Sequence, residues 1–118
     1  MPTIRNTTTV AAGLVNGNIL QGSQFEFLGA PSRIQIYAQE DTTGANGVAE
    51  LEVFFGQELE LAQTRINGRD GNDVRVPDDL LLDDIGAAGD RLVLRATETG
   101  GVNAAVFVTQ VKITPIPM

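Results

Sequence analysis

The stretch Arg33-Ile34-Gln35-Ile36-Tyr37-Ala38-Gln39 decides the fold class, because apolar and polar residues alternate along it. A period of two places successive side chains on opposite faces, which is typical of a half-buried β-strand. Residues 48–55 alternate in the same way, with two glutamates on one face and the apolar residues on the other. Turn residues 41–47 separate the two segments, so the pattern predicts an antiparallel hairpin with a long tip.

The same rhythm runs outward from this stretch in both directions. It predicts shorter strands before it and longer ones after it, over residues 4–10, 18–20, 24–28, 58–66, 91–97 and 104–114. Residues 91–97 and 104–114 flank a turn and are expected to form a second hairpin, and the apolar run 104–108 predicts a strand covered on both faces. Roughly seven or eight short strands with regular turns predict an all-β fold: a single antiparallel β-sandwich with jelly-roll or Greek-key connections.

One segment breaks the rhythm. Pro77 and several aspartates precede and follow a run of three leucines, and glycines and alanines come next. Proline and acidic residues suit the first turn of a helix. The pattern therefore predicts one short helix or helical turn near 78–85, at one end of the sandwich.

The chain has 118 residues, which is enough for one domain with one core. No linker, repeat or low-complexity tract divides it, so residues 1–118 are expected to form one unit with extended terminal arms at about 1–9 and 113–118. No stretch is long and apolar enough to span a membrane. No basic segment followed by an apolar one stands at the start, so no secretory signal is expected.

Composition excludes several classes of function. The chain has no Cys and no His, the residues on which zinc sites, thiol chemistry and acid–base catalysis near neutral pH most often depend. We therefore expect no enzyme and no cofactor. Fifteen acidic residues face eight basic ones, seven of which are Arg, and the net charge of −7 disfavours direct contact with nucleic acid. This acidic, lysine-poor composition fits either adaptation to high salt or the codon bias of a GC-rich genome.

A calcium site is one candidate for bound chemistry. Asp70, Asn72 and Asp73 belong to an oxygen-rich stretch that continues through Asp78, Asp79, Asp83, Asp84 and Asp90. Calcium prefers six to eight oxygen ligands, but the stretch lacks the later glutamate of the twelve-residue calcium loop. The alternative is a solvated acidic loop whose aspartates cap a helix, and we expect no metal.

Carboxylate pairs are a second candidate. Glu50 with Glu52, and Glu58 with Glu60, would project from one face of a strand as the catalytic pair of a glycosidase does. These faces look solvent-exposed, and a sugar site would also need aromatic platforms, whereas the chain has no Trp and one Tyr. Phe54 should point the same way as the glutamates, so an exposed Phe54 would mark a contact surface.

The two termini are a third candidate. Ile4 and Arg5 lie in a β-branched segment with a single charge, and the tail is apolar, with Ile116 and Met118 separated by a proline. An extended apolar tail packs either on its own sandwich or on a neighbouring subunit.

In its size, its cysteine-free acidic composition and its strand-and-turn rhythm, the chain resembles the small β-rich structural proteins of virus particles. The terminal arms around Thr7-Thr8-Thr9 and Pro115-Ile116-Pro117 strengthen the likeness to the decoration or cement proteins of tailed viruses. The resemblance implies a homo-oligomer, with a trimer favoured, that clamps major capsid proteins from outside the shell. It also implies a virion location after synthesis in the host cytoplasm.

The working hypothesis is a non-enzymatic capsid decoration protein whose partners are its own copies and another virion protein. A jelly-roll coat subunit is the nearest variant of this hypothesis. A carbohydrate-binding or calcium-binding β-sandwich is the alternative from another class.

Overall fold

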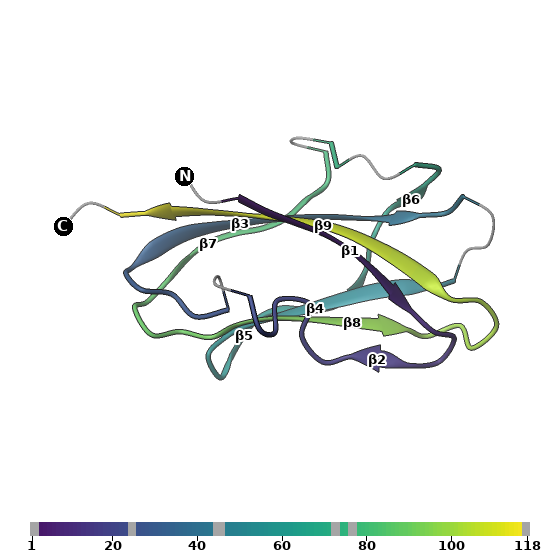
Figure 1. Ribbon diagram of the computed structural model, residues 1–118, viewed down its shortest axis with the longest axis horizontal. Helices are drawn as coiled ribbons and strands as arrows, with labels where there is room; N and C mark the ends of the chain where they lie inside the picture. Colours follow the sequence, from purple (N-terminus) through teal and green to yellow (C-terminus); the bar gives the residue numbers. More distant parts are fainter. Residues whose placement is uncertain (1–2, 24–25, 44–46, 72–73, 76–77, 117–118) are drawn as a thin grey trace.

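Two facing sheets make up the computed structural model, which describes residues 3–23, 26–43, 47–71, 74–75 and 78–116. Figure 1 shows the two layers one above the other. Sheet A contains β1 (Thr3–Val10), β9 (Ala105–Pro115) and β3 (Ser32–Asp41), with β7 (Leu80–Gly86) and β6 (Gly68–Arg69) on the far side of β3. Sheet B contains, in order, β2 (Val15–Asn16), β8 (Leu92–Glu98), β4 (Ala49–Phe55) and β5 (Glu58–Arg65).

The strands pair as nested antiparallel couples. When the two-residue β6 is set aside, the first strand pairs with the last, the second with the next to last, β3 with β7 and β4 with β5. The couples alternate between the two sheets, which gives the orders β1-β9-β3-β7 and β2-β8-β4-β5. This connectivity is that of a jelly roll, and it confirms the predicted all-β sandwich.

The core lies between the sheets and follows the period-two pattern. Burial alternates without a break along β4 and β8, and the inward positions of both strands are apolar except for Glu98. Phe107 of β9 is the largest fully buried side chain, and it packs among aliphatic residues from both sheets, including Ile34, Ile36, Leu51, Val53, Leu92 and Leu94. The alternation in the sequence therefore predicts the apolar core positions of β4 and β8.

The predicted helix near 78–85 is wrong. Residues 80–86 form β7, which pairs with β3 from Ser32 to Tyr37, and the described residues contain no helix. The three leucines that suggested a helix are each half-buried along this edge. Pairing with the open side of β3 outweighs the local helix signal of Asp and Leu. Among the described residues, no helix is long and apolar enough to cross a membrane.

The two predicted hairpins are also wrong. β3 and β4 are consecutive strands, yet they belong to opposite sheets, and the same is true of β8 and β9. Each connection crosses from one layer to the other at the right-hand end of Figure 1. A turn of ordinary composition can either reverse a strand within a sheet or pass it to the facing sheet, so the sequence pattern did not distinguish the two.

The strand expected at 18–20 is wrong: these residues form a turn. The side chain of Asn18 in this turn makes the hydrogen bonds to β8 that a neighbouring strand would make. Asn18 is buried, and its Oδ1 accepts hydrogen bonds from the backbone NH groups of Leu20 and Leu94, at 3.0 and 3.1 Å. Its Nδ2 donates to the carbonyl of Leu92, at 3.1 Å. Asn18 thus binds the carbonyl of Leu92 and the NH of Leu94 on the edge of β8, beyond the point where β2 ends at Asn16.

Gly71, which follows β6, lies over part of the outer face of sheet A. Gln39 and Val108 point outward from neighbouring strands, yet both are fully buried. The side-chain amide of Gln39 donates to the carbonyl of Gly71 at 2.9 Å, which places this glycine over the sheet. The prediction that the run 104–108 is covered on both faces is therefore confirmed only at Phe107 and Val108, which are both buried, whereas Ala104 and Val106 are half-buried.

Candidate interaction surfaces

The end of β8 carries a buried carboxylate that holds three loops together, and we call this arrangement the Glu98 clasp. Glu98 is 1% exposed. One carboxylate oxygen, Oε1, accepts hydrogen bonds from the backbone NH groups of Gly13 and Gly101, at 3.0 and 2.6 Å. The other, Oε2, accepts them from Val48 and Gly100, at 2.6 and 2.9 Å. The clasp thus joins the β1–β2, β3–β4 and β8–β9 connections, all at the right-hand end of Figure 1.

Four donated hydrogen bonds favour the charged form of this carboxyl. Those from Val48 and Gly101 are the strongest, and together with those from Gly13 and Gly100 they outweigh burial and lower the pKa of Glu98 to about 2. The close packing also requires glycine at position 47. A Cβ there would lie 2.6 Å from the carbonyl oxygen of Asn103 and 2.8 Å from Oε2 of Glu98.

A second buried carboxyl, Glu40, lies beside the clasp, and its pKa is shifted in the opposite direction. It is 2% exposed and accepts a hydrogen bond from the NH of Gly47 at 3.1 Å, next to the NH of Val48 that binds Glu98. Burial raises the pKa of Glu40. The hydrogen bond from Gly47 and the charge of Arg65 lower it, while the charge of Glu98 raises it again.

Two neighbouring carboxyls whose pKa values move apart are a familiar sign of acid–base chemistry. Here both side chains are almost fully covered, and each oxygen of Glu98 already accepts two backbone hydrogen bonds. A catalytic carboxyl must reach its substrate directly or through one water. The pair is therefore suited to fixing loop conformation.

The acidic stretch proposed for calcium is divided among separate contacts. Asn72 and Asp73 lie outside the described residues. Asp70 is exposed and accepts a hydrogen bond from the Thr42 hydroxyl at 2.9 Å. Asp79 is buried and pairs with Arg69 through both carboxylate oxygens. Over the residues that the structure describes, no three acidic side chains gather in a way that could hold a metal ion.

Asp79 anchors its segment to the domain. Burial raises the pKa of Asp79, but the hydrogen bonds from Arg69 and from the NH of Arg75, together with the charges of both arginines, outweigh it, so the pKa lies below its ordinary value. The backbone carbonyl of Asp79 also accepts from the NH of Ala38 at 3.1 Å. This aspartate therefore fastens the segment before β7 to sheet A.

The two predicted carboxylate pairs lie on different parts of sheet B, one on its outer face and one on its edge strand. Glu50 and Glu52 share the outer face of sheet B, where Glu52 pairs with Arg95 at 3.0 Å and Glu50 accepts from Thr99 at 2.6 Å. Glu58 and Glu60 lie on the edge strand β5. Burial raises the pKa of Glu60, and the neighbouring Asp84 and Glu58 raise it further.

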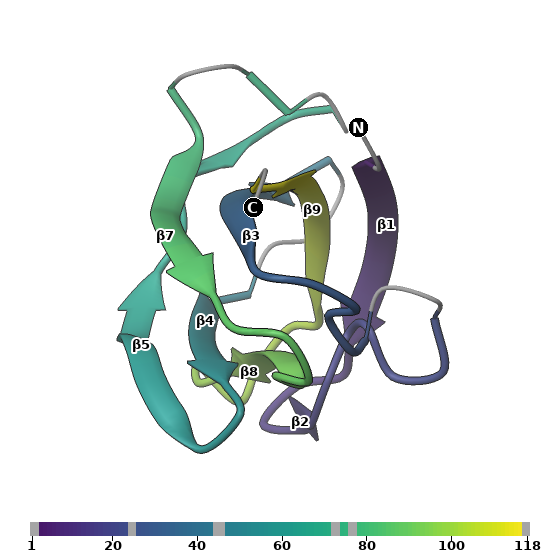
Figure 2. The ribbon, with the colours of Figure 1, turned by 90° about the vertical axis from the view of Figure 1, so that its left-hand side faces the viewer.

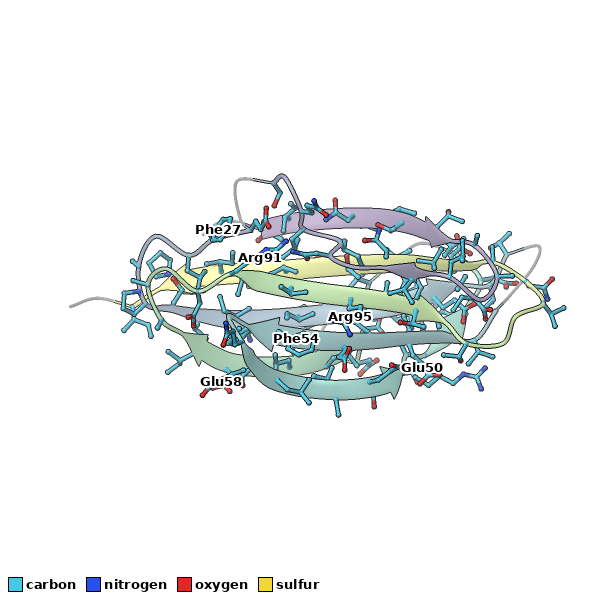
Figure 3. The ribbon with its side chains drawn as sticks, turned by 90° about the horizontal axis from the view of Figure 1, so that it is seen from below. Phe27, Glu50, Phe54, Glu58, Arg91 and Arg95 are labelled. Carbon is cyan, nitrogen blue, oxygen red and sulfur yellow. The ribbon has the colours of Figure 1, made fainter. Side chains whose placement is uncertain are left out.

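The outer face of sheet B, called here the sheet B face, carries an apolar row. The strand register places Leu59, Phe54 and Val93 directly opposite one another on neighbouring strands. Phe54 is half-buried, and the guanidinium of Arg95 lies 5.2 Å from the centre of its ring. Figure 3 looks onto this face and shows Arg95 beside Phe54, with Phe27 and Arg91 toward one end. Phe27 is 59% exposed.

The predicted terminal contacts belong to sheet A. Ile4 is half-buried and Arg5 exposed, on opposite faces of β1. Ile116 is half-buried, and its NH donates to the carbonyl of Pro31 at 2.9 Å, so the tail up to this point packs on its own domain. Met118 lies outside the described residues.

The sequence reasoning missed Glu40, Glu98 and Asn18. Both glutamates occupy the next inward position of an alternating strand, after Ala38 and Ala96 respectively. Continuing the alternation by one step would have shown a carboxylate directed into the core at a strand end. Glycines 47, 100 and 101 nearby were a further signal of exposed backbone NH groups.

The chain matches no family model, no curated protein and no solved structure in the comparisons with known proteins.

Proposed function

We propose that this chain is a non-enzymatic structural subunit of a virus particle, which binds the outside of the shell as a homo-oligomer. The observation that carries the proposal is the nested strand order of a jelly roll. This architecture recurs in capsid subunits, lectins and cupins, and fold alone does not choose among them. The choice rests on the side chains that this chain places on the fold.

Those side chains favour a structural role over a ligand site. The chain has no His or Cys for a metal-centred reaction. Its two most buried glutamates, Glu40 and Glu98, accept hydrogen bonds from backbone NH groups of loops. Its single tyrosine, Tyr37, is 4% exposed and offers no platform for a sugar ring. The polar interior thus fixes shape, as a subunit of a larger assembly requires.

We place the contact with the shell on the sheet B face. The apolar row of Leu59, Phe54 and Val93 crosses this face, and Arg65, Arg91 and Arg95 extend from it in a chain whose net charge is −7. Aromatic residues and arginines are the side chains most enriched at the energetic centres of interfaces. Arg91 and Arg95 pair with the chain's own Glu26 and Glu52. The apolar row therefore makes this face suited to a shell surface that is partly apolar.

Light scattering of the purified chain at low and at multimolar salt tests the proposal. We expect a discrete homo-oligomer under at least one condition. A monomer under all conditions would contradict the proposal. So would a calcium-dependent rise of several degrees in melting temperature, or clear binding on a glycan array, because either would favour the ligand-binding alternative.

A further inference from the structure

We propose that the end of the sandwich that carries the Glu98 clasp is the surface through which two copies of the chain associate end to end. The inference rests on the proposed function, because it names the contact by which the subunit meets its own copies. We call this surface the clasp end and define it by residues 11–15, 42–43, 47–48 and 99–104, at the right-hand end of Figure 1. Figure 2 views the molecule from the opposite end.

Exposed apolar side chains gather at the clasp end. Leu14 is 59%, Val15 54% and Val102 82% exposed, and these are three of the six large apolar side chains that are exposed among the described residues. The residues just before Leu14 and Val102 donate their NH groups to the same carboxylate oxygen of Glu98. The three side chains therefore extend from loops that lie side by side. A cluster of this kind indicates a contact surface, whereas single exposed apolar residues do not.

The loops of the clasp end carry no charged residue. Residues 6–25, 42–49 and 99–111 contain no Asp, Glu, Lys or Arg, in a chain whose net charge is −7. Asp41, Glu50 and Arg65 stand at or near the strand ends that border this surface.

This distribution of charge points to a second copy as the occupant. Two chains of the same net charge repel each other, and at the clasp end they can meet without facing carboxylates. An uncharged aliphatic surface is also complementary to itself, as the isologous contact of a two-fold pair requires. A membrane is disfavoured, because surfaces that enter lipid headgroups are rich in Trp, Tyr, Lys and Arg, which the three loops lack.

The clasp fixes the conformation of this surface before any contact is made. Besides the four NH groups that bind Glu98, the NH of Leu14 donates to the carbonyl of Ala11 at 3.0 Å, and the NH of Thr99 donates to that of Val48 at 3.1 Å. Loops that are already ordered lose less conformational entropy on association than mobile ones. The clasp thus prepares the apolar side chains for contact.

The dimensions of the molecule make this contact a weak one. The molecule measures 47 × 26 × 22 Å, and the clasp end lies at one end of its long axis. A cross-section of 26 × 22 Å is smaller than the roughly 800 Å² that each partner of a stable complex buries. We therefore expect the pair to need salt, which screens the like charges and, as sulfate, strengthens apolar burial.

Light scattering and small-angle X-ray scattering of the full chain in increasing ammonium sulfate test the contact. We expect a pair about twice as long as the 47 Å of one copy, because the two copies meet along their long axes. Sulfate should promote this pair more strongly than chloride. A pair that dissociates as salt is added would be held by ion pairs and would overturn the inference.

Val102→Asp places a charge in the apolar contact. Because Val102 is 82% exposed, the variant should keep the melting temperature of wild type, while its mass falls to that of one copy. Ile85→Asp is the matched control: Ile85 is 62% exposed and the added charge is the same, but it pairs with Arg33 at the other end of the sandwich. This control should keep the mass of the pair, and so should Val102→Leu, which stays apolar.

The outcomes separate this inference from the proposed function. A long pair that Val102→Asp divides and Ile85→Asp does not divide supports association through the clasp end. A wild-type oligomer that Val102→Asp and Leu14→Asp both leave intact overturns it and leaves the proposed function standing. Binding to phosphatidylcholine vesicles that Val102→Asp abolishes would also overturn it, because the occupant would then be a lipid surface. A wild-type monomer under all conditions overturns both.

Discussion

The Glu98 clasp and the neighbouring Glu40 are buried carboxylates with different numbers of backbone donors. In the clasp, four backbone NH groups from three loops converge on one buried carboxylate. Glu40 accepts a hydrogen bond from the backbone NH of Gly47. The difference teaches how this chain accommodates buried acids: the four donors lower the pKa of Glu98 to about 2, whereas burial raises the pKa of Glu40.

Replacing the carboxylate of the clasp is expected to have the largest effect. Glu98→Gln puts an NH₂ group opposite two backbone NH groups and removes the charge that all four bind. Hydrogen bonds to charged groups are the stronger class, and buried donors left unpaired are costly. We expect the melting temperature to fall by more than about 10 °C, measured by circular dichroism. A fall of only a few degrees would show that the loops do not depend on the clasp.

Acid should weaken the clasp in a defined range of pH. The pKa of Glu98 is lowered from 4.5 to about 2, so its contribution to stability is complete above pH 4.5 and is lost as the pH falls toward 2. The pKa values of Glu26, Asp41, Asp79 and Asp83 are lowered too and act in the same direction. Melting curves between pH 7 and pH 2 should therefore fall more steeply for wild type than for Glu98→Gln. Parallel curves would contradict this.

Adding a methyl group at Gly47 should perturb the loops that the clasp holds together, without changing Glu98 itself. The new Cβ would lie 2.6 Å from the Asn103 carbonyl oxygen, so the β3–β4 and β8–β9 connections would have to move apart. Overpacking of this kind costs about 1–3 kcal/mol. Urea unfolding of Gly47→Ala measures this cost, and Gly29→Ala, where the added Cβ meets no atom within 4 Å, is the control.

Replacing Glu40, which lies next to the clasp, should change the melting temperature least. Because the pKa of Glu40 is raised, its stabilising contribution is present below 4.5 and is lost as the pH rises through the raised value. Glu40→Gln keeps an acceptor for the NH of Gly47 and removes the buried charge, so at pH 7 we expect a melting temperature equal to wild type or a few degrees higher. A loss as large as that of Glu98→Gln would show that both carboxylates belong to the clasp.

The sequence predicted the strands better than their partners. Period-two alternation placed β3, β4, β5, β8 and β9 nearly to the residue, because burial on one face selects apolar side chains at every second position. It could not predict that β3 and β4 lie in different sheets, since crossing between layers depends on the whole chain. The segment 80–86 was misread because β7 forms through pairing with β3, which is distant in sequence.

The surfaces were predicted unevenly for similar reasons. Phe54 was correctly expected to share a face with Glu50 and Glu52, because all three positions follow one alternation. The clasp was out of reach because its donors come from Gly13, Val48 and Gly101, which only the jelly-roll connections bring together.

Amide-resolved hydrogen exchange of the groups that bind Glu98 tests the central claim most directly. The account predicts that the NH groups of Gly13, Val48, Gly100 and Gly101 are protected in wild type, because each donates to Glu98. In Glu98→Gln these four groups should exchange faster, while the NH of Ala38 in sheet A, which donates to the carbonyl of Asp79, should keep its protection. Equal exchange of the four groups in the two proteins would contradict the account that the Glu98 clasp holds the three loops together.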